Sequence, residues 1–145
     1  MADGAFSDRV RAGVHARDAD RCVGCRRTSP LTLQHRRARG RGGVHGAAAE
    51  RSGSAANALL LHGSGTTGCH GWCESHPDEA ERLGWRIGAF DPREARQVPV
   101  FGWWMGQLLW RYLDPSDECM WRFATTAEHE ALPPVEVARL WLPVR

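Results

Sequence analysis

At 145 residues with a formal net charge of +2, the chain is expected to form one domain with a modest core. It has no apolar run of 18 residues and no signal-peptide apolar segment, so we expect no membrane span and residence in the cytoplasm. The small net charge conceals an asymmetry. Residues 1–51 hold 11 arginines and 5 acidic residues, whereas residues 52–145 hold 8 arginines and 12 acidic residues. The basic part favours a polyanion such as nucleic acid, although a solvated arginine-rich face would have the same composition.

The first predicted element is a short helix over residues 7–19. Phe6, Val10 and Val14 recur every four residues, and Ser7 can serve as the N-cap. This spacing places the three apolar side chains on one helix face, so we expect the helix to take part in packing rather than in chemistry.

Four of the five cysteines form two close pairs, Cys22 with Cys25 and Cys69 with Cys73. In a chain expected inside the cell, such pairs favour metal binding over disulfides. Structural zinc takes four nitrogen or sulfur ligands in a tetrahedron. Cys22, Cys25 and Cys69 supply three, and both His62 and Cys73 remain candidates for the fourth. A thiol-redox function is disfavoured, because no βαβ pattern surrounds the first pair.

The next predicted element is a strand over Leu31–His35, where apolar and polar residues alternate. An arginine- and glycine-rich segment follows it. Arginine can bind phosphate oxygens through two parallel hydrogen bonds, and glycine lets the backbone approach a phosphate closely. We therefore expect phosphate contacts from Arg36, Arg37, Arg39 and Arg41. Residues 44–56 are predicted to be a loop that either follows a DNA backbone or is an ordinary insertion.

A second strand is predicted over Ala58–Leu61, directly after Asn57. A glycine-rich loop leads from it to a helix that begins near Cys69, with Thr66 or Thr67 as its cap. His70 lies in the first turn of this helix and Glu74 lies four residues later. The two side chains are therefore expected on one helix face.

The order of these motifs resembles the HNH endonucleases, the ββα-metal nucleases that are common in phages and bacteria. His35, Asn57 and His70 stand at the positions that give that family its name. The resemblance covers residues 15–90. It implies an α+β fold with a small zinc-stapled ββα-metal core and an N-terminal helix in residues 1–90. Residues 91–145 would form an aromatic-rich, β-containing extension that packs on this core or on a partner.

The resemblance also implies a function, the metal-dependent hydrolysis of phosphodiester bonds in double-stranded DNA. His35 would be the general base, and Asn57 would brace the loop that carries it. Gln34, His70 and Glu74 would bind the catalytic ion, Mg²⁺ or another divalent ion such as Mn²⁺, Ni²⁺ or Zn²⁺. Gln34 departs from the aspartate or histidine usual in the family. Arginine–phosphate contacts position DNA without reading its sequence, so we expect low intrinsic specificity.

For the structural zinc, the resemblance favours His62 as the fourth ligand. Zinc-bearing members of the family usually have a thiol at the end of the strand after the asparagine, and His62 occupies that position. The zinc set would then be Cys22, Cys25, His62 and Cys69, with Cys73 as the reserve ligand.

The remaining residues are less informative. Trp85–Ile87 and Val98–Phe101 are predicted to be extended, and residues 91–145 contain five of the seven tryptophans. Acidic residues outnumber arginines in residues 52–145, so core packing or a protein interface is a better explanation of these tryptophans than base stacking.

Two other functions remain open. The first is a non-catalytic, zinc-stapled module for DNA binding or scaffolding, which the neutral Gln34 favours. The second is a phage packaging accessory, an HNH nuclease that acts beside a terminase in the host cytoplasm and docks through its aromatic C-terminal region.

Overall fold

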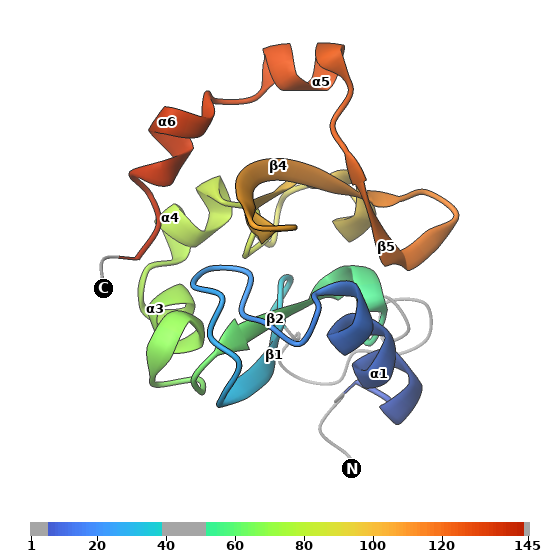
Figure 1. The fold of residues 1–145 in the computed structure, drawn as a ribbon, viewed down its shortest axis with the longest axis vertical. Helices are drawn as coiled ribbons and strands as arrows, with labels where there is room; N and C mark the ends of the chain where they lie inside the picture. Colours follow the sequence, from blue (N-terminus) through green and yellow to red (C-terminus); the bar gives the residue numbers. More distant parts are fainter. Residues whose placement is uncertain (1–5, 39–51, 144–145) are drawn as a thin grey trace.

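The computed structural model describes residues 6–38 and 52–143 of the chain, beginning with the predicted N-terminal helix (Figure 1). Helix α1 spans Asp8–Arg17, and the Ser7 hydroxyl accepts a hydrogen bond from the Val10 amide at 3.2 Å. Phe6 and Val14 are both buried, and they pack in one apolar cluster with residues of the following hairpin. The helix therefore has the packing role that its sequence pattern predicted.

An antiparallel hairpin forms the first sheet. Strand β1 (Leu31–His35) pairs with strand β2 (Ala58–His62), from Leu31 opposite His62 to His35 opposite Ala58. A 3₁₀ turn over Ala55–Asn57 leads into β2. Because side chains alternate along a strand, Leu33 and Leu60 face α1 while Leu59 and Leu61 enter the main core on the other face. The first strand lies where alternation predicted it, and the second lies where the apolar run after Asn57 predicted it.

Helix α3 (Gly68–Ser75) packs against β2, and helix α4 (Pro77–Arg82) follows it with proline in its first turn. Gly84 ends this region with φ +75°, and a Cβ there would overlap the Pro99 carbonyl. Two sequence predictions are corrected here. Thr67 is the N-cap residue, but its hydroxyl accepts from the Ser64 amide rather than from the helix. Residues 85–87 form no strand.

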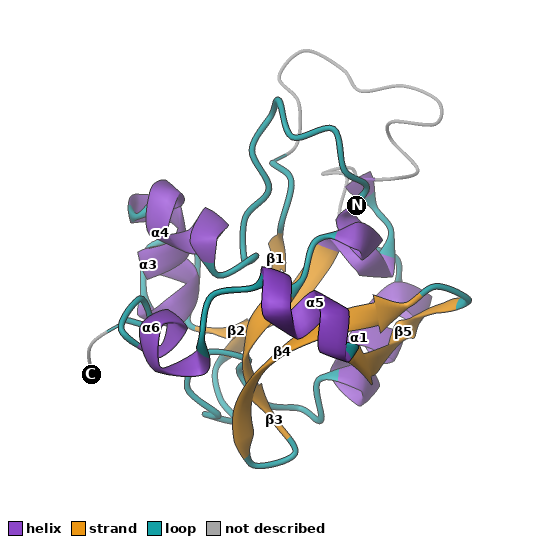
Figure 2. Ribbon diagram, turned by 90° about the horizontal axis from the view of Figure 1, so that it is seen from above, coloured by secondary structure: helices purple, strands orange, loops and turns teal. Residues whose placement is uncertain are grey.

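The second sheet contains three antiparallel strands in the order β3–β4–β5. They span Val100–Trp104, Gln107–Asp114 and Asp117–Phe123, and a short 3₁₀ turn, η2 (Ala95–Gln97), precedes them. Helices α5 (Thr126–Ala131) and α6 (Val135–Arg139) complete the chain. Figure 2 shows α3, α4 and α6 grouped on one side of the molecule and α1 with β5 on the other. The α+β class and the β-containing C-terminal part thus agree with the sequence prediction.

One core joins the two sheets. Its buried members come from both sides of residue 90 and include Leu59, Leu61, Trp85, Phe101 and Trp110. The Trp85 indole N–H donates to the Phe101 carbonyl at 2.8 Å, which ties the segment after α4 to β3. Several C-terminal aromatic residues are therefore core residues rather than an exposed surface.

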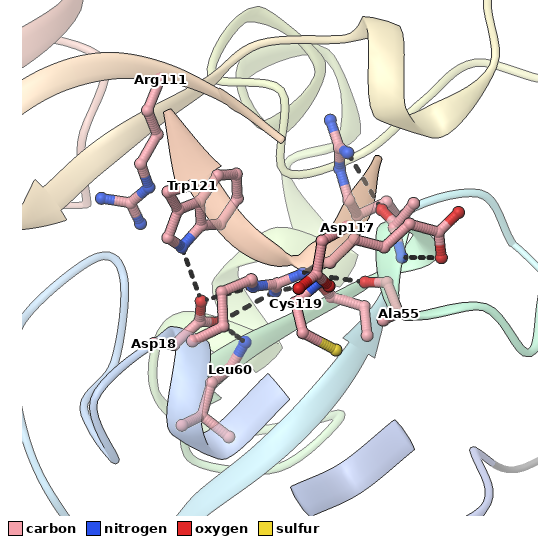
Figure 3. A network of polar contacts seen from close by, with 12 residues as sticks. Asp18, Ala55, Leu60, Arg111, Asp117, Cys119 and Trp121 are labelled. Atoms are coloured by element: carbon pink, nitrogen blue, oxygen red, sulfur yellow. Dashed lines mark hydrogen bonds and ion pairs between the residues drawn. The ribbon is translucent and has the colours of Figure 1, made fainter. Parts of the chain in front are cut away.

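A buried polar network connects α1 to the second sheet (Figure 3). Arg17 and Asp18 form an ion pair at 2.8 Å, with both side chains fully buried. The Asp18 carboxylate also accepts from the Trp121 indole at 2.9 Å and from the Leu60 amide at 3.1 Å. The Arg17 and Arg111 guanidinium carbons lie 4.5 and 4.4 Å from the centre of the Trp121 ring. The network links residues more than 100 positions apart in the chain.

No helix among the described residues is both long and apolar enough to cross a membrane.

Candidate metal sites

Three cysteines meet between the turn after α1 and the start of α3. The sulfur atoms of Cys22, Cys25 and Cys69 all lie within 4.8 Å of one another. The Gly24 amide donates to the Cys22 sulfur at 3.3 Å. A Cβ at Gly24 would overlap the Trp85 ring, so glycine lets the turn lie against the core. Tetrahedral zinc with bonds of about 2.3 Å holds its sulfurs roughly 3.8 Å apart. The three thiols therefore fit a zinc ion after only small movements.

The electrostatics of the cluster also suit a cation. The neighbouring Cys22 and Cys25 thiols, together with burial, raise the pKa of Cys69 far above its usual value. The Cys25 thiol is the main cause of a raised pKa at Cys22, although the Cys69 thiol and, to a smaller extent, the His62 backbone oppose it. Three thiols this close cannot all become thiolates unless a cation balances their charge, and a zinc ion supplies that charge.

The fourth ligand is not among the mutually close donors, because neither His62 nor Cys73 belongs to that group. The His62 backbone is nevertheless close to the cluster, because it acts to lower the pKa of Cys22 against the larger upward effect of Cys25. A Cβ on Gly68 would come within 2.6 Å of His62 Nδ1. Cys73 is fully buried, and burial raises its pKa to about 12. The charged groups that affect the pKa of Cys73 are Arg86 and Glu74, which belong to the second site, around His70, and not to the three-cysteine cluster.

That second site lies between β1 and α3. The Thr32 hydroxyl donates to the Gly63 carbonyl at 2.7 Å and contacts His70 Nδ1 at 2.6 Å. A hydroxyl has one proton, so His70 must donate from Nδ1. This assignment leaves the Nε2 lone pair for a metal, and Nε2 lies 4.0 Å from a Glu74 carboxylate oxygen. Burial lowers the pKa of His70, more than Glu74 raises it, which favours the neutral form that metals bind.

Gln34 shares the face of β1 that carries Thr32. It is only 1% exposed, and its Oε1 has no hydrogen-bond partner among the described residues, whereas its Nε2 donates to the His35 carbonyl at 2.9 Å. A buried amide oxygen without a donor is costly, and a bound cation would satisfy it. Glu74 lies near the same end of β1. It pairs with Arg86 at 3.2 Å, and the amide of Ile87, the residue after Arg86, donates to the carbonyl of Arg36, the residue after β1.

His35 lies on the other side of the hairpin. Its ring stacks on Phe6 with a centroid distance of 4.1 Å and an interplanar angle of 21°. Phe6 belongs to the cluster that faces α1, whereas Thr32 and His70 lie on the α3 face. The structure therefore brings Gln34, rather than the His35 ring, onto the strand face that meets His70.

Asn57 connects β2 to the segment after His35. Its Oδ1 accepts from the Arg37 amide at 2.7 Å, and its Nδ2 donates to the carbonyls of Arg37 and Ser52 at 3.2 and 3.0 Å. The asparagine is 2% exposed. It thus holds both backbone groups of Arg37, two residues after His35.

Two of the four arginines expected to bind phosphate have a different role in the structure. Arg36 is fully buried, and its guanidinium donates to the carbonyls of residues 56, 84, 95 and 98. Arg37 donates to the carbonyls of residues 88, 91 and 93. Phosphate binding does not fit Arg36, because backbone carbonyls already occupy its guanidinium in the interior. Arg39 and Arg41 lie outside the described residues.

Sequence reasoning missed two contributors to the second site, Thr32 and Arg86. Thr32 could have been found, since it lies two residues before Gln34 on one strand face. Arg86 had no local signal. Arg86 also lines a cleft of about 880 Å³, together with Arg37, Asn57, Gly88, Asp91 and Arg93.

The described structure thus defines an α+β protein with a three-cysteine cluster that could hold a metal ion. Comparison with family models, curated proteins and solved structures found no match for this chain.

Proposed function

We propose that this chain is a metal-dependent endonuclease of the HNH type, which hydrolyses DNA phosphodiester bonds with low intrinsic sequence specificity. The observation that carries the proposal is the His70 environment. Thr32 fixes the imidazole so that Nε2 is left to bind a metal, beside the Glu74 carboxylate. The unsatisfied Gln34 oxygen on the same strand face gives further support. One nitrogen, one carboxylate oxygen and one amide oxygen form a ligand set for Mg²⁺ or Mn²⁺.

The proposed residue roles follow from this arrangement. His70, Glu74 and Gln34 would hold the ion, which when bound neutralises charge on the phosphate and stabilises the leaving oxygen. His35 would take a proton from the attacking water. Its stack on Phe6 uses the ring face, so proton transfer would use a nitrogen on the ring edge. Asn57 would keep the following backbone in place. The structural zinc would be held by Cys22, Cys25 and Cys69, with His62 as fourth ligand.

The test is plasmid cleavage by zinc-loaded protein with Mg²⁺, Mn²⁺ or Ni²⁺ added or withheld. We expect nicking or linearisation that depends on the added ion. His35→Ala and His70→Ala should each slow cleavage by roughly 10²- to 10⁴-fold, the range for loss of a positioned proton-transfer group or its metal. His129→Ala on α5 is the matched control, because His129 is exposed and remote in the chain from both metal sites. Equal rates for His35→Ala and wild type would contradict the mechanism.

A second substitution tests the proposed metal ligands. Gln34→Asp should tighten Mn²⁺ binding by roughly tenfold, because ligand charge sets the affinity of oxygen sites for divalent ions. Calorimetric titration of zinc-loaded protein with Mn²⁺ measures this change. Gln107→Asp on the exposed part of β4 adds the same charge elsewhere and should have no effect. If both variants bind Mn²⁺ with the wild-type affinity, Gln34 is not a ligand.

A non-catalytic, zinc-stapled binding module is the second candidate. The neutral Gln34 and the His35 ring on the α1 side favour it. It predicts DNA binding without cleavage in every metal, by protein that is folded and zinc-loaded. The phage packaging function gains no support from the aromatic residues, because Trp110 and Trp121 are buried in the core.

A further inference from the structure

Phe90 is the most exposed large apolar residue among those described, with its side chain 100% exposed. It is the third residue of a turn from Gly88 to Asp91, which the Asp91 amide closes by donating to the Gly88 carbonyl at 3.1 Å. A phenyl ring directed into water gives up all of its burial free energy. The ring is therefore a candidate for contact with a partner.

The turn that carries Phe90 is held by hydrogen bonds from the Arg37 side chain. The Arg37 guanidinium donates to the carbonyls of Gly88 and Asp91, at the two ends of the turn, at 2.8 and 3.2 Å. It donates also to the Arg93 carbonyl at 2.8 Å, and Arg93 in turn pairs with the Asp91 carboxylate at 2.7 Å. Asn57 holds the backbone of Arg37. A ring presented on an ordered turn loses little conformational entropy on binding.

The position of the turn indicates what the ring could meet. Ala89 and Asp91, on either side of Phe90, line the cleft of about 880 Å³, while the phenyl ring is not among its lining residues. The same cleft is lined by Asn57, which binds the Arg37 backbone two residues after His35, and by Arg86, which pairs with Glu74. The phenyl ring thus stands at the margin of the cleft that adjoins the candidate catalytic site. Four arginines line this cleft, at positions 37, 86, 93 and 96, and four acidic residues, at positions 81, 91, 94 and 118, balance their charge. The aromatic ring, rather than an excess of positive charge, is therefore the feature of this margin that a partner would meet.

We infer that Phe90 stacks on, or inserts between, the bases of a DNA duplex bound at this cleft. The inference rests on the proposed function and adds a contact to the bases. Every base has a π-face, so an aromatic contact is tolerant of sequence and agrees with low specificity. Apolar side chains that enter a base step from the minor groove also bend the duplex.

The experiment measures binding without cleavage. Zinc-loaded, full-length protein is titrated into a fluorescein-labelled 30-base-pair duplex without other divalent ions, and anisotropy gives Kd over a series of salt concentrations. Phe90→Ala should raise Kd by roughly 5- to 150-fold, the loss expected for one stacked base. The slope of log Kd against log salt should stay at its wild-type value, because no phosphate contact is removed. Phe90→Trp should restore binding.

Leu140→Ala is the matched control, because Leu140 is 81% exposed after α6 and does not line the cleft. It should bind as wild type does. If wild-type protein binds duplex and Phe90→Ala binds equally well, the inference is overturned and the proposed function is untouched. If wild-type protein binds no duplex even at low salt, the proposed function itself fails and the inference falls with it.

Discussion

Replacing Cys69 by serine is expected to abolish zinc binding and to lower the free energy of unfolding by about 4 kcal/mol or more. Zinc in small domains contributes roughly 10–16 kcal/mol of binding free energy, and much of it is folding free energy. Here the metal would join the turn after α1 to the first turn of α3, so its loss disconnects two parts of the main core. For a chain of this length the melting temperature should fall by roughly 10 °C. Elemental analysis and thermal unfolding measure the two effects.

Cys119→Ser is the control for that substitution, because Cys119 lies on β5 outside the three-cysteine cluster. It should keep the wild-type zinc content. The same zinc assay on His62→Ala and Cys73→Ala distinguishes the two candidates for the fourth ligand. His62 adjoins Cys22 and Gly68, whereas Cys73 is buried near Arg86, so we expect His62→Ala to weaken zinc retention more. A Cys69→Ser protein with full zinc content and unchanged melting would contradict a zinc site here.

The parts of the fold that the sequence predicted well are those set by local patterns. Alternation located β1, a short apolar run located β2, and the thiol spacing identified cysteines that the fold brings together. The α3 start was also readable from its glycine-rich loop. The strand and helix signals lie within a few residues of the elements that they describe, so no knowledge of the tertiary structure was needed for them.

The roles of the arginines after β1 could not be predicted in the same way. An arginine- and glycine-rich segment is typical of a phosphate-binding loop, and nothing in it shows where each guanidinium points. Arg36 binds carbonyls 20 to 62 residues away in sequence, and Arg37 binds carbonyls more than 50 residues away. Apart from the Ala56 carbonyl, these partners lie in residues 84–98, between α4 and the second sheet. Tertiary contacts, rather than local pattern, decide between a phosphate ligand and an internal cross-link.

The Asp18 network had no sequence signal for the same reason. Trp121 is 103 residues from Asp18, and the acidic pair around Ala19 resembles an ordinary helix end. Only the fold reveals that one of the two carboxylates is buried with two arginines, while the other is exposed beside His15.

Asp18→Asn is expected to lower the free energy of unfolding by about 3–5 kcal/mol, the usual cost of removing one partner from a buried ion pair. Each carboxylate oxygen accepts two hydrogen bonds. One oxygen accepts from Arg17 Nε and the Trp121 indole, and the other accepts from Arg17 Nη2 and the Leu60 amide. In either orientation, the Asn amide group would turn its N–H donors toward two other donors. Asp20→Asn, at an exposed position nearby, should change stability by less than about 0.5 kcal/mol.

The pH dependence of stability distinguishes the contribution of the Asp18 charge from that of its hydrogen-bond geometry. Burial alone would raise the pKa of Asp18, but the charge and hydrogen bonds of Arg17, with help from Arg111, hold it below the usual 3.8. A carboxyl with a depressed folded-state pKa stabilises the fold at pH above its unfolded value, and this contribution is lost as the pH falls through the folded value. The difference between wild type and Asp18→Asn in urea unfolding should therefore be constant from pH 5 to 7 and shrink below pH 4. A difference that stayed constant down to pH 2 would show that geometry, rather than the buried charge, sets the stability of this network.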